Sequence, residues 1–140
     1  MSKSAHELAI DILARRDNSI KEMRTKLRSK KLDSETIEET IIWLIDKRLL
    51  NDRDFAQKKA ESIMRTKLSG PRYLSNKLRE AGIDSDIINE VIDGLATQEE
   101  WEQRAKDAIA QWQRIHPKHK DDTVRKQRFL ASRGFDRSYF

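Results

Sequence analysis

The chain has 140 residues, of which 36% are apolar, 38% are charged and none is cysteine. Ordinary globular domains are roughly 45–50% apolar, so the composition argues against one thick core. The lack of cysteine excludes disulfides, thiolate metal sites and cysteine nucleophiles. The start of the chain lacks the apolar run of a signal peptide, and no run approaches the roughly 20 residues of a membrane span. We therefore expect a soluble cytoplasmic protein without a membrane association.

The net charge is +5 and is unevenly distributed. Residues 105–140 contain nine Lys or Arg against four Asp or Glu, whereas residues 52–104 contain nine against eleven. An excess of this kind indicates an anionic partner at the C-terminal end, although modest basicity is also common in proteins that bind nothing charged.

The first 50 residues predict three short helices. Residues 4–16 have an apolar stripe at helical spacing and a serine to cap it. Ser19 and Glu22 then form a capping box, in which both side chains satisfy free backbone donors at a helix start. Asp33 begins the third helix. The side chains expected to face inward on that helix are Ile37, Ile41, Leu44 and Ile45.

The following stretch predicts three more helices in the same order. Asn51 caps a helix over 53–66, and we interpret Asp52 and Asp54 as acids that suit a helix start rather than as a catalytic pair. Pro71 lies near the first turn of the next helix, where its missing N–H costs nothing, and Gly82 ends that helix as a left-handed cap. A sixth helix begins at residues 84–85.

The two stretches are copies of one unit. Shifted by 51 positions, Ala60–Ala96 aligns without a gap on Ala9–Ile45, and eleven of the 37 pairs are identical. Strict helical spacing with this repeat argues against disorder, the competing interpretation of so polar a chain. A fixed period of this length indicates small units that stack in a line, each burying one face against the next.

A third copy begins after residue 96. Thr97 and Glu100 form another capping box, and helices are expected to about residue 115 and again from Thr123 to about Ser132. Asp136 is placed to cap a last helix, yet the sequence stops at Phe140, so either the chain is truncated or that last helix is absent. The predicted fold is all-α, an elongated tandem array of helix-turn-helix-like three-helix repeats over residues 1–51, 52–96 and 97–140, the third incomplete.

Catalytic and metal chemistry is poorly represented. His116 and His119 lie beside Asp121 and Asp122, but the spacing is loose and the acids are explained as a helix cap. There is no nucleophile–base set and no glycine-rich phosphate loop. We expect neither an enzyme nor a bound cofactor or metal.

What remains is a basic row on the middle helix of each unit. One interpretation of such a row is a helix face exposed to solvent without a partner. The other is a binding surface, because repeated rows suit a long, regularly charged partner such as a nucleic-acid backbone or a protein polymer. No unit carries, at the start of a helix, the cluster of Arg, Asn and Gln side chains that reading of DNA bases requires. The candidate partner-binding residues are Lys21, Arg24, Arg28 and Lys31, then Arg72, Lys77 and Arg79, then Arg125, Lys126 and Arg128.

Several motifs resemble those of the RecX regulatory proteins, and they occur in the family's order. The segments that carry the resemblance are 13–19 with Lys26-Leu27, then 49–56 (LLNDRDFA), then 70–83 (GPRYL through LREAGI), and finally Phe129-Leu130 with Arg133-Gly134-Phe135. The resemblance spans residues 9–140, except that the family's third repeat usually has its own final helix.

This resemblance implies a monomeric protein that lies in the groove of the RecA–DNA filament and restrains the ATPase activity of RecA, filament growth and strand exchange. Recombination, DNA repair and the SOS response would be moderated in consequence. The basic rows leave open whether they face DNA phosphates or acidic surfaces of RecA. A plain DNA-binding array, blind to sequence, is therefore the second hypothesis.

Overall fold

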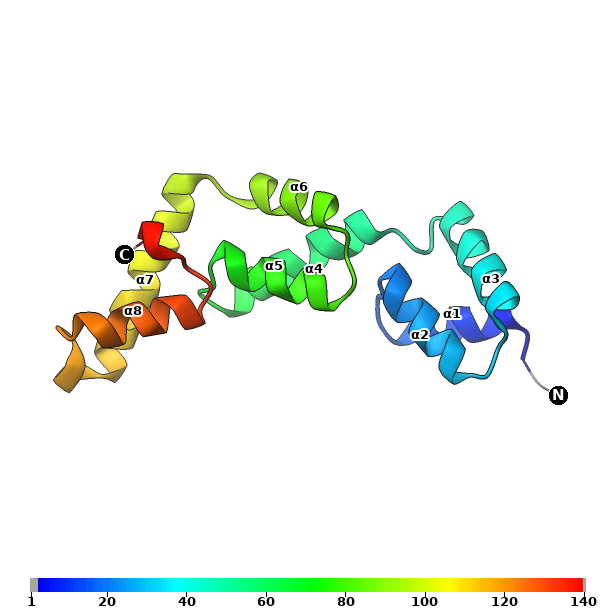
Figure 1. The fold of residues 1–140 in the computed structure, drawn as a ribbon, viewed down its shortest axis with the longest axis horizontal. Helices are drawn as coiled ribbons and strands as arrows, with labels where there is room; N and C mark the ends of the chain where they lie inside the picture. The colour runs from blue at the N-terminus through cyan, green and yellow to red at the C-terminus, as the bar shows by residue number, and fades with distance from the viewer. Residues whose placement is uncertain (1–2, 140) are drawn as a thin grey trace.

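A computed structural model describes residues 3–139, and in that range the protein is all-helical. The elements are α1 (Ala5–Arg15), α2 (Ile20–Ser29), α3 (Ser34–Asp46), α4 (Asp52–Thr66), α5 (Pro71–Glu80), α6 (Ser85–Leu95), α7 (Gln98–Ile115) and α8 (Thr123–Ser132), with 3-10 turns η1 (Pro117–His119) and η2 (Arg137–Tyr139). Figure 1 shows them as a curved, elongated array with α1–α3 at one end and α7 and α8 at the other. The predicted all-α tandem arrangement is confirmed.

Most helices begin at the predicted residues because a polar side chain accepts from a free N–H group of the first turn, whereas α5 and α6 begin without such a side-chain cap. Both capping boxes are present, at Ser19 with Glu22 and at Thr97 with Glu100. Pro71 is the first residue of α5. The helix expected over 53–66 begins one residue earlier, at Asp52, with Asn51 as its cap.

Three clusters of buried side chains lie along the array. The first joins α1–α3 and includes Met23, Leu27 and Leu44, while the second joins α4–α6 and includes Leu74 and Leu78. A smaller third cluster lies between α7 and α8, and Trp101 at the start of α7 packs into the second. Each cluster is small, as expected for stacked units that share interfaces. The division at residues 51/52 and 96/97 stays a prediction.

One inward position was predicted wrongly. Ile45 is 43% exposed, next to Ile42, which is 59% exposed. The chain turns sharply after α3, where Arg48 has φ of 59°, and Leu50 returns to the first cluster with 2% of its surface exposed. Leu50, and not Ile45, is therefore part of the first cluster.

The C-terminal segment follows the expected positions as far as α8. Gly134 ends α8 with φ of 87°, and Phe135 is 1% exposed in the third cluster. Asp136, expected to cap a helix, accepts from the backbone N–H of Ser138 at 2.9 Å within the turn η2.

Candidate partner-binding surface

The middle helices α2, α5 and α8 lie end to end, which the sequence did not reveal. The Ser19 hydroxyl at the start of α2 donates to the carbonyl of Ala81 at the end of α5, at 2.6 Å. At the next junction Gly70 N–H donates to Arg133 O at 2.7 Å, and Arg72 N–H donates to Gly134 O at 3.1 Å. Free donors at one helix start thus meet free acceptors at the end of the next helix, and the helix dipoles run head to tail.

Glycine makes this end-to-end contact possible. A Cβ on Gly82 would lie 2.3 Å from Cδ of Lys21, and one on Gly134 would lie 2.3 Å from the backbone nitrogen of Tyr73. Both glycines have positive φ, at 85° and 87°, a conformation that side chains disfavour. The same residue type in the same place at both junctions indicates one repeated interface.

The basic row on α2 is partly neutralised. Arg24 makes a two-pronged contact with Glu38 on α3, at 2.7 and 3.2 Å, and the hydrogen bond from Arg24 lowers the pKa of Glu38. Arg28 and Lys31 are exposed, while the stem of Lys21 packs on Gly82. Arg24 is therefore the least available cation of its row.

The rows on α5 and α8 remain largely in solvent. Arg72 and Arg79 are exposed, and Lys77 lies 3.5 Å from Glu80. On α8, Arg125 pairs with its own cap, Asp122, at 3.1 Å. The last two members of the α8 row are the half-buried Lys126 and the exposed Arg128.

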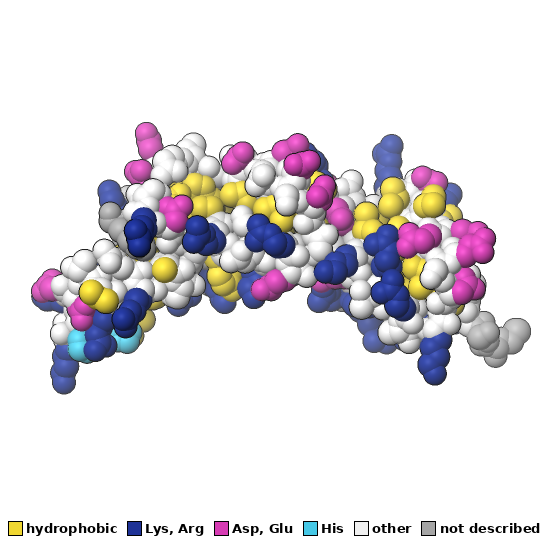
Figure 2. Space-filling model, in the orientation of Figure 1, with side chains coloured by type: hydrophobic (Ala, Val, Ile, Leu, Met, Phe, Trp, Pro, Cys, Tyr) yellow, Lys and Arg dark blue, Asp and Glu magenta, His cyan; other side chains and the backbone are white. Residues whose placement is uncertain are grey.

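End-to-end stacking brings the three rows onto one extended body. Figure 2 shows Lys and Arg side chains spaced along the length of the face drawn, while Asp and Glu gather mainly over α6 and α3. Exposed charges separated by more than about 8–10 Å are largely screened at physiological salt. Cations spread in this way suit many weak contacts with an extended partner better than one strong contact with a compact ligand.

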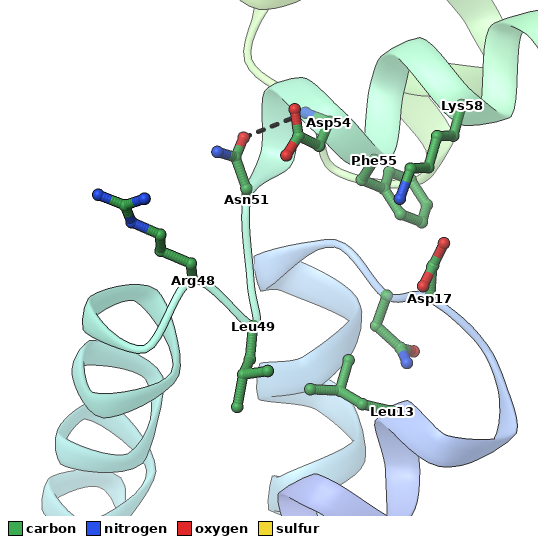
Figure 3. Close-up of a pocket in the computed structure, with 9 residues that line it drawn as sticks. Leu13, Asp17, Arg48, Leu49, Asn51, Asp54, Phe55 and Lys58 are labelled. Carbon is green, nitrogen blue, oxygen red and sulfur yellow. Dashed lines mark hydrogen bonds between the residues drawn. The ribbon is translucent and has the colours of Figure 1, made fainter.

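The segment 49–56 joins the first two units. Leu50 packs into the first cluster and Phe55 into the second. Figure 3 shows Asn51 accepting from the N–H of Asp54, and Leu49 next to Leu13, two residues that line a pocket between the units. One of the segments that carry the resemblance is thus a structural joint.

Asp52 has a role that the sequence did not indicate. Its Oδ1 accepts from Ile20 N–H at the start of α2, at 2.8 Å. Burial raises the pKa of Asp52, although the Ile20 hydrogen bond and nearby Arg24 act in the opposite direction. An acid interpreted as serving its own helix start also satisfies the start of another helix.

Replacing Asp52 by alanine is expected to lower the free energy of unfolding by about 1–2 kcal/mol, because Ile20 N–H loses its acceptor. The raised pKa means that the folded state binds the proton more readily, so ionisation of Asp52 costs stability as pH rises from 3.8 through the raised pKa. Asp52→Asn keeps the acceptor and should remove this part of the pH dependence. Urea unfolding of both variants across pH 3–7 checks this, and equal losses in both would contradict it.

Arg104 on α7 stabilises the segment between α4 and α5, which leads into the junction of α5 with α8. Its guanidinium donates to Met64 O at 3.2 Å, Lys67 O at 2.7 Å and Ser69 O at 3.3 Å. These carbonyls lie at and beyond the end of α4, where helices leave acceptors free. Burial lowers the pKa of Arg104, yet the three acceptors compensate for the desolvation of its charge.

The described residues provide neither a metal-binding group nor a membrane-spanning helix. Among residues 3–139, no group of three or more His, Cys, Asp or Glu side chains is placed to hold a metal ion. In the same range, no helix has the length and apolarity needed to cross a membrane.

Family models and curated relatives match this chain. A model of the first three-helix domain of RecX matches residues 5–44, and a model of the second matches residues 51–92. Regulatory protein RecX of Chlorobium phaeobacteroides is 33% identical over 137 residues, covering 96% of this chain and 87% of that protein. The corresponding Listeria monocytogenes protein (strain CLIP80459) is 34% identical over 101 residues, covering 72% of this chain but only 38% of its own length.

Solved structures agree in fold. The crystal structure of RecX from Lactobacillus salivarius superposes with a TM-score of 0.85 at 25% identity, covering 96% of this chain and 88% of that one. A second crystal structure of a regulatory protein RecX has a TM-score of 0.87 at 22% identity and covers 96% of this chain and 68% of that one. The fold is therefore that of an all-helical protein of tandem three-helix domains. The chain belongs to the RecX family of regulatory proteins.

Proposed function

We propose that this protein binds the RecA–DNA filament and restrains the ATPase activity of RecA, filament growth and strand exchange. Recombination, DNA repair and the SOS response are moderated as a result. It acts in the cytoplasm as a monomer, without a cofactor and without chemistry of its own. Membership of a family of regulatory proteins supports the regulatory part of this proposal.

The end-to-end stacking of α2, α5 and α8 carries the proposal. A filament presents the same surface at regular intervals, and a partner that repeats its own contacts can occupy several of these surfaces at once. The three rows supply such a repeat, held at fixed spacing by the junctions at Ser19–Ala81 and Gly70–Arg133. Contacts of modest strength then add, since each later contact is intramolecular once the first has formed.

A DNA-binding array that ignores sequence is the alternative function. It is favoured by the nine Lys and Arg against four Asp and Glu in residues 105–140, which would neutralise phosphates and release counterions. The two functions differ in what limits inhibition. A filament modulator acts on RecA already bound to DNA, whereas a DNA coater must compete for bare DNA.

RecA ATP hydrolysis on single-stranded DNA separates them. At a ratio of about one protein per ten RecA molecules, we expect at least a halving of the steady rate even when the filament is assembled first, because each bound chain blocks several protomers. A matched reaction with excess bare DNA controls for coating. If ATP hydrolysis is inhibited only when bare DNA is covered, and not on preformed filaments, the modulator proposal is wrong.

A further inference from the structure

A pocket between the end of α4, α7 and the end of α8 is lined by cations that the basic rows do not include. It has a volume of about 310 Å³, and its lining includes Arg65 and Lys67 at the end of α4, Gln111 on α7 and Arg133 at the end of α8. No Asp or Glu lines it. We call it the junction pocket.

The cations of this pocket have no acidic partner among residues 3–139. Within the part of the chain that the structure describes, neither Arg65, Lys67 nor Arg133 takes part in an ion pair. The Arg133 guanidinium lies 5.2 Å from the ring centre of Phe129, so an aromatic face rather than a carboxylate supports it. Like charges held close together repel one another, and a bound anion relieves that repulsion.

Tyr73 extends the cationic group toward the α5 row. Lys67 Nζ donates to the Tyr73 hydroxyl oxygen at 2.9 Å, which leaves the hydroxyl hydrogen available to a ligand. Lys67 and Lys77 lie 5.1 and 5.5 Å from the ring centre. The hydrogen bond from Lys67, with the charges of Lys67, Lys77 and Arg133, lowers the pKa of the Tyr73 phenol, as expected where positive charge accumulates.

We propose that the junction pocket binds a phosphodiester group of single-stranded nucleic acid, held by Lys67, Arg133 and the Tyr73 hydroxyl. A pocket of this volume is larger than a bare phosphate requires and leaves room for the attached sugar. The cations converge from separate helices, and a flexible single strand can bend its backbone into such a pocket. Basic groups beside an aromatic ring, here the partly exposed Tyr73 next to the pocket, are also typical of sites for single-stranded nucleic acid.

This inference adds a direct nucleic-acid contact to the proposed filament binding, and it is tested without RecA. The probe is a fluorescent deoxythymidine oligomer of about 20 nucleotides, read by anisotropy. The double variant Lys67→Gln, Arg133→Gln is expected to bind at least tenfold more weakly. Its plot of log affinity against log salt should be shallower by about 1.4, since each phosphate neutralised on a single strand contributes about 0.7.

The matched control is Lys58→Gln, Lys106→Gln, which removes the same charge from exposed side chains outside the pocket. It should change affinity less than twofold, and circular dichroism should show equal helix content in all variants. Tyr73→Phe tests the hydroxyl, with a loss of about threefold expected. Equal losses in both double variants, equal affinity for duplex, or displacement of the oligomer by millimolar inorganic phosphate would each overturn the proposal. Inhibition of RecA by the pocket variant is measured separately. If the variant still inhibits RecA and still binds the oligomer as wild type does, this inference fails and the proposed function stands.

Discussion

Replacing Gly134 by alanine is expected to lower the free energy of unfolding of the C-terminal end of the array by about 3 kcal/mol. A side chain at φ of 87° costs about 1–2 kcal/mol. The new Cβ would also lie 2.3 Å from the backbone nitrogen of Tyr73, and relieving such overpacking costs about 1–3 kcal/mol more. The contacting atoms are the backbone nitrogen, Cα and Cβ of Tyr73, so no rotation of a side chain removes the clash.

Hydrogen exchange by mass spectrometry locates the effect. In a linear array each unit depends on its neighbours only, so α8 and the third cluster should lose protection while α1–α3 keep theirs. Gly94→Ala is the matched control, because a Cβ there meets no atom within 4 Å. The free energy of unfolding of that variant should rise by about 0.5–1 kcal/mol, the usual difference between glycine and alanine inside a helix. Unchanged protection of α8 in Gly134→Ala would refute the junction described above.

Reversing one exposed cation on each stacked helix is expected to weaken binding to the RecA filament about 100-fold. Arg28, Arg79 and Arg128 lie on α2, α5 and α8 and are all exposed. At roughly 1 kcal/mol for each reversed charge at an interface rim, three changes to glutamate give a factor of about 100. Arg24 is left out because it already pairs with Glu38.

Co-pelleting with the filament or surface plasmon resonance measures this loss of affinity. Raised salt should reduce the difference in affinity between the variant and the wild type. Lys47→Glu, Lys58→Glu, Lys106→Glu carries the same change of charge at exposed positions off the three rows, and it should bind within about threefold of wild type. If the control loses as much as the row variant, binding depends on net charge alone and the rows have no special role.

Features that depend on neighbours in sequence could be predicted. The capping box at Ser19 and Glu22, the proline start of α5 and the left-handed Gly82 each follow from residues within a few positions, and all are present. Ile45 shows the limit of periodicity, because it lies exposed while Leu50, beyond the turn at Arg48, is buried in the first cluster. Helical spacing does not foresee where the chain goes after the helix ends.

The contacts between units could not be predicted from the sequence. Ser19 and Ala81 are 62 positions apart, and Arg104 reaches carbonyls 35 to 40 positions away. Backbone carbonyls carry no residue signature, so nothing in the sequence identifies Arg104 as their partner. The contact of Asp52 with Ile20 was not predicted, because an acid at the start of its own helix needs no further explanation. The ten cations of the basic rows remain a proposed surface, and the pocket at Lys67 and Arg133 lies beside them rather than among them.

Electron cryo-microscopy of RecA filaments assembled on single-stranded DNA with this protein bound tests the central claim most directly. We expect one chain in the filament groove, contacting more than one RecA protomer, with α2, α5 and α8 facing the filament. Density on the outer ridge, on bare DNA alone, or with the opposite face of the array toward RecA would contradict the account.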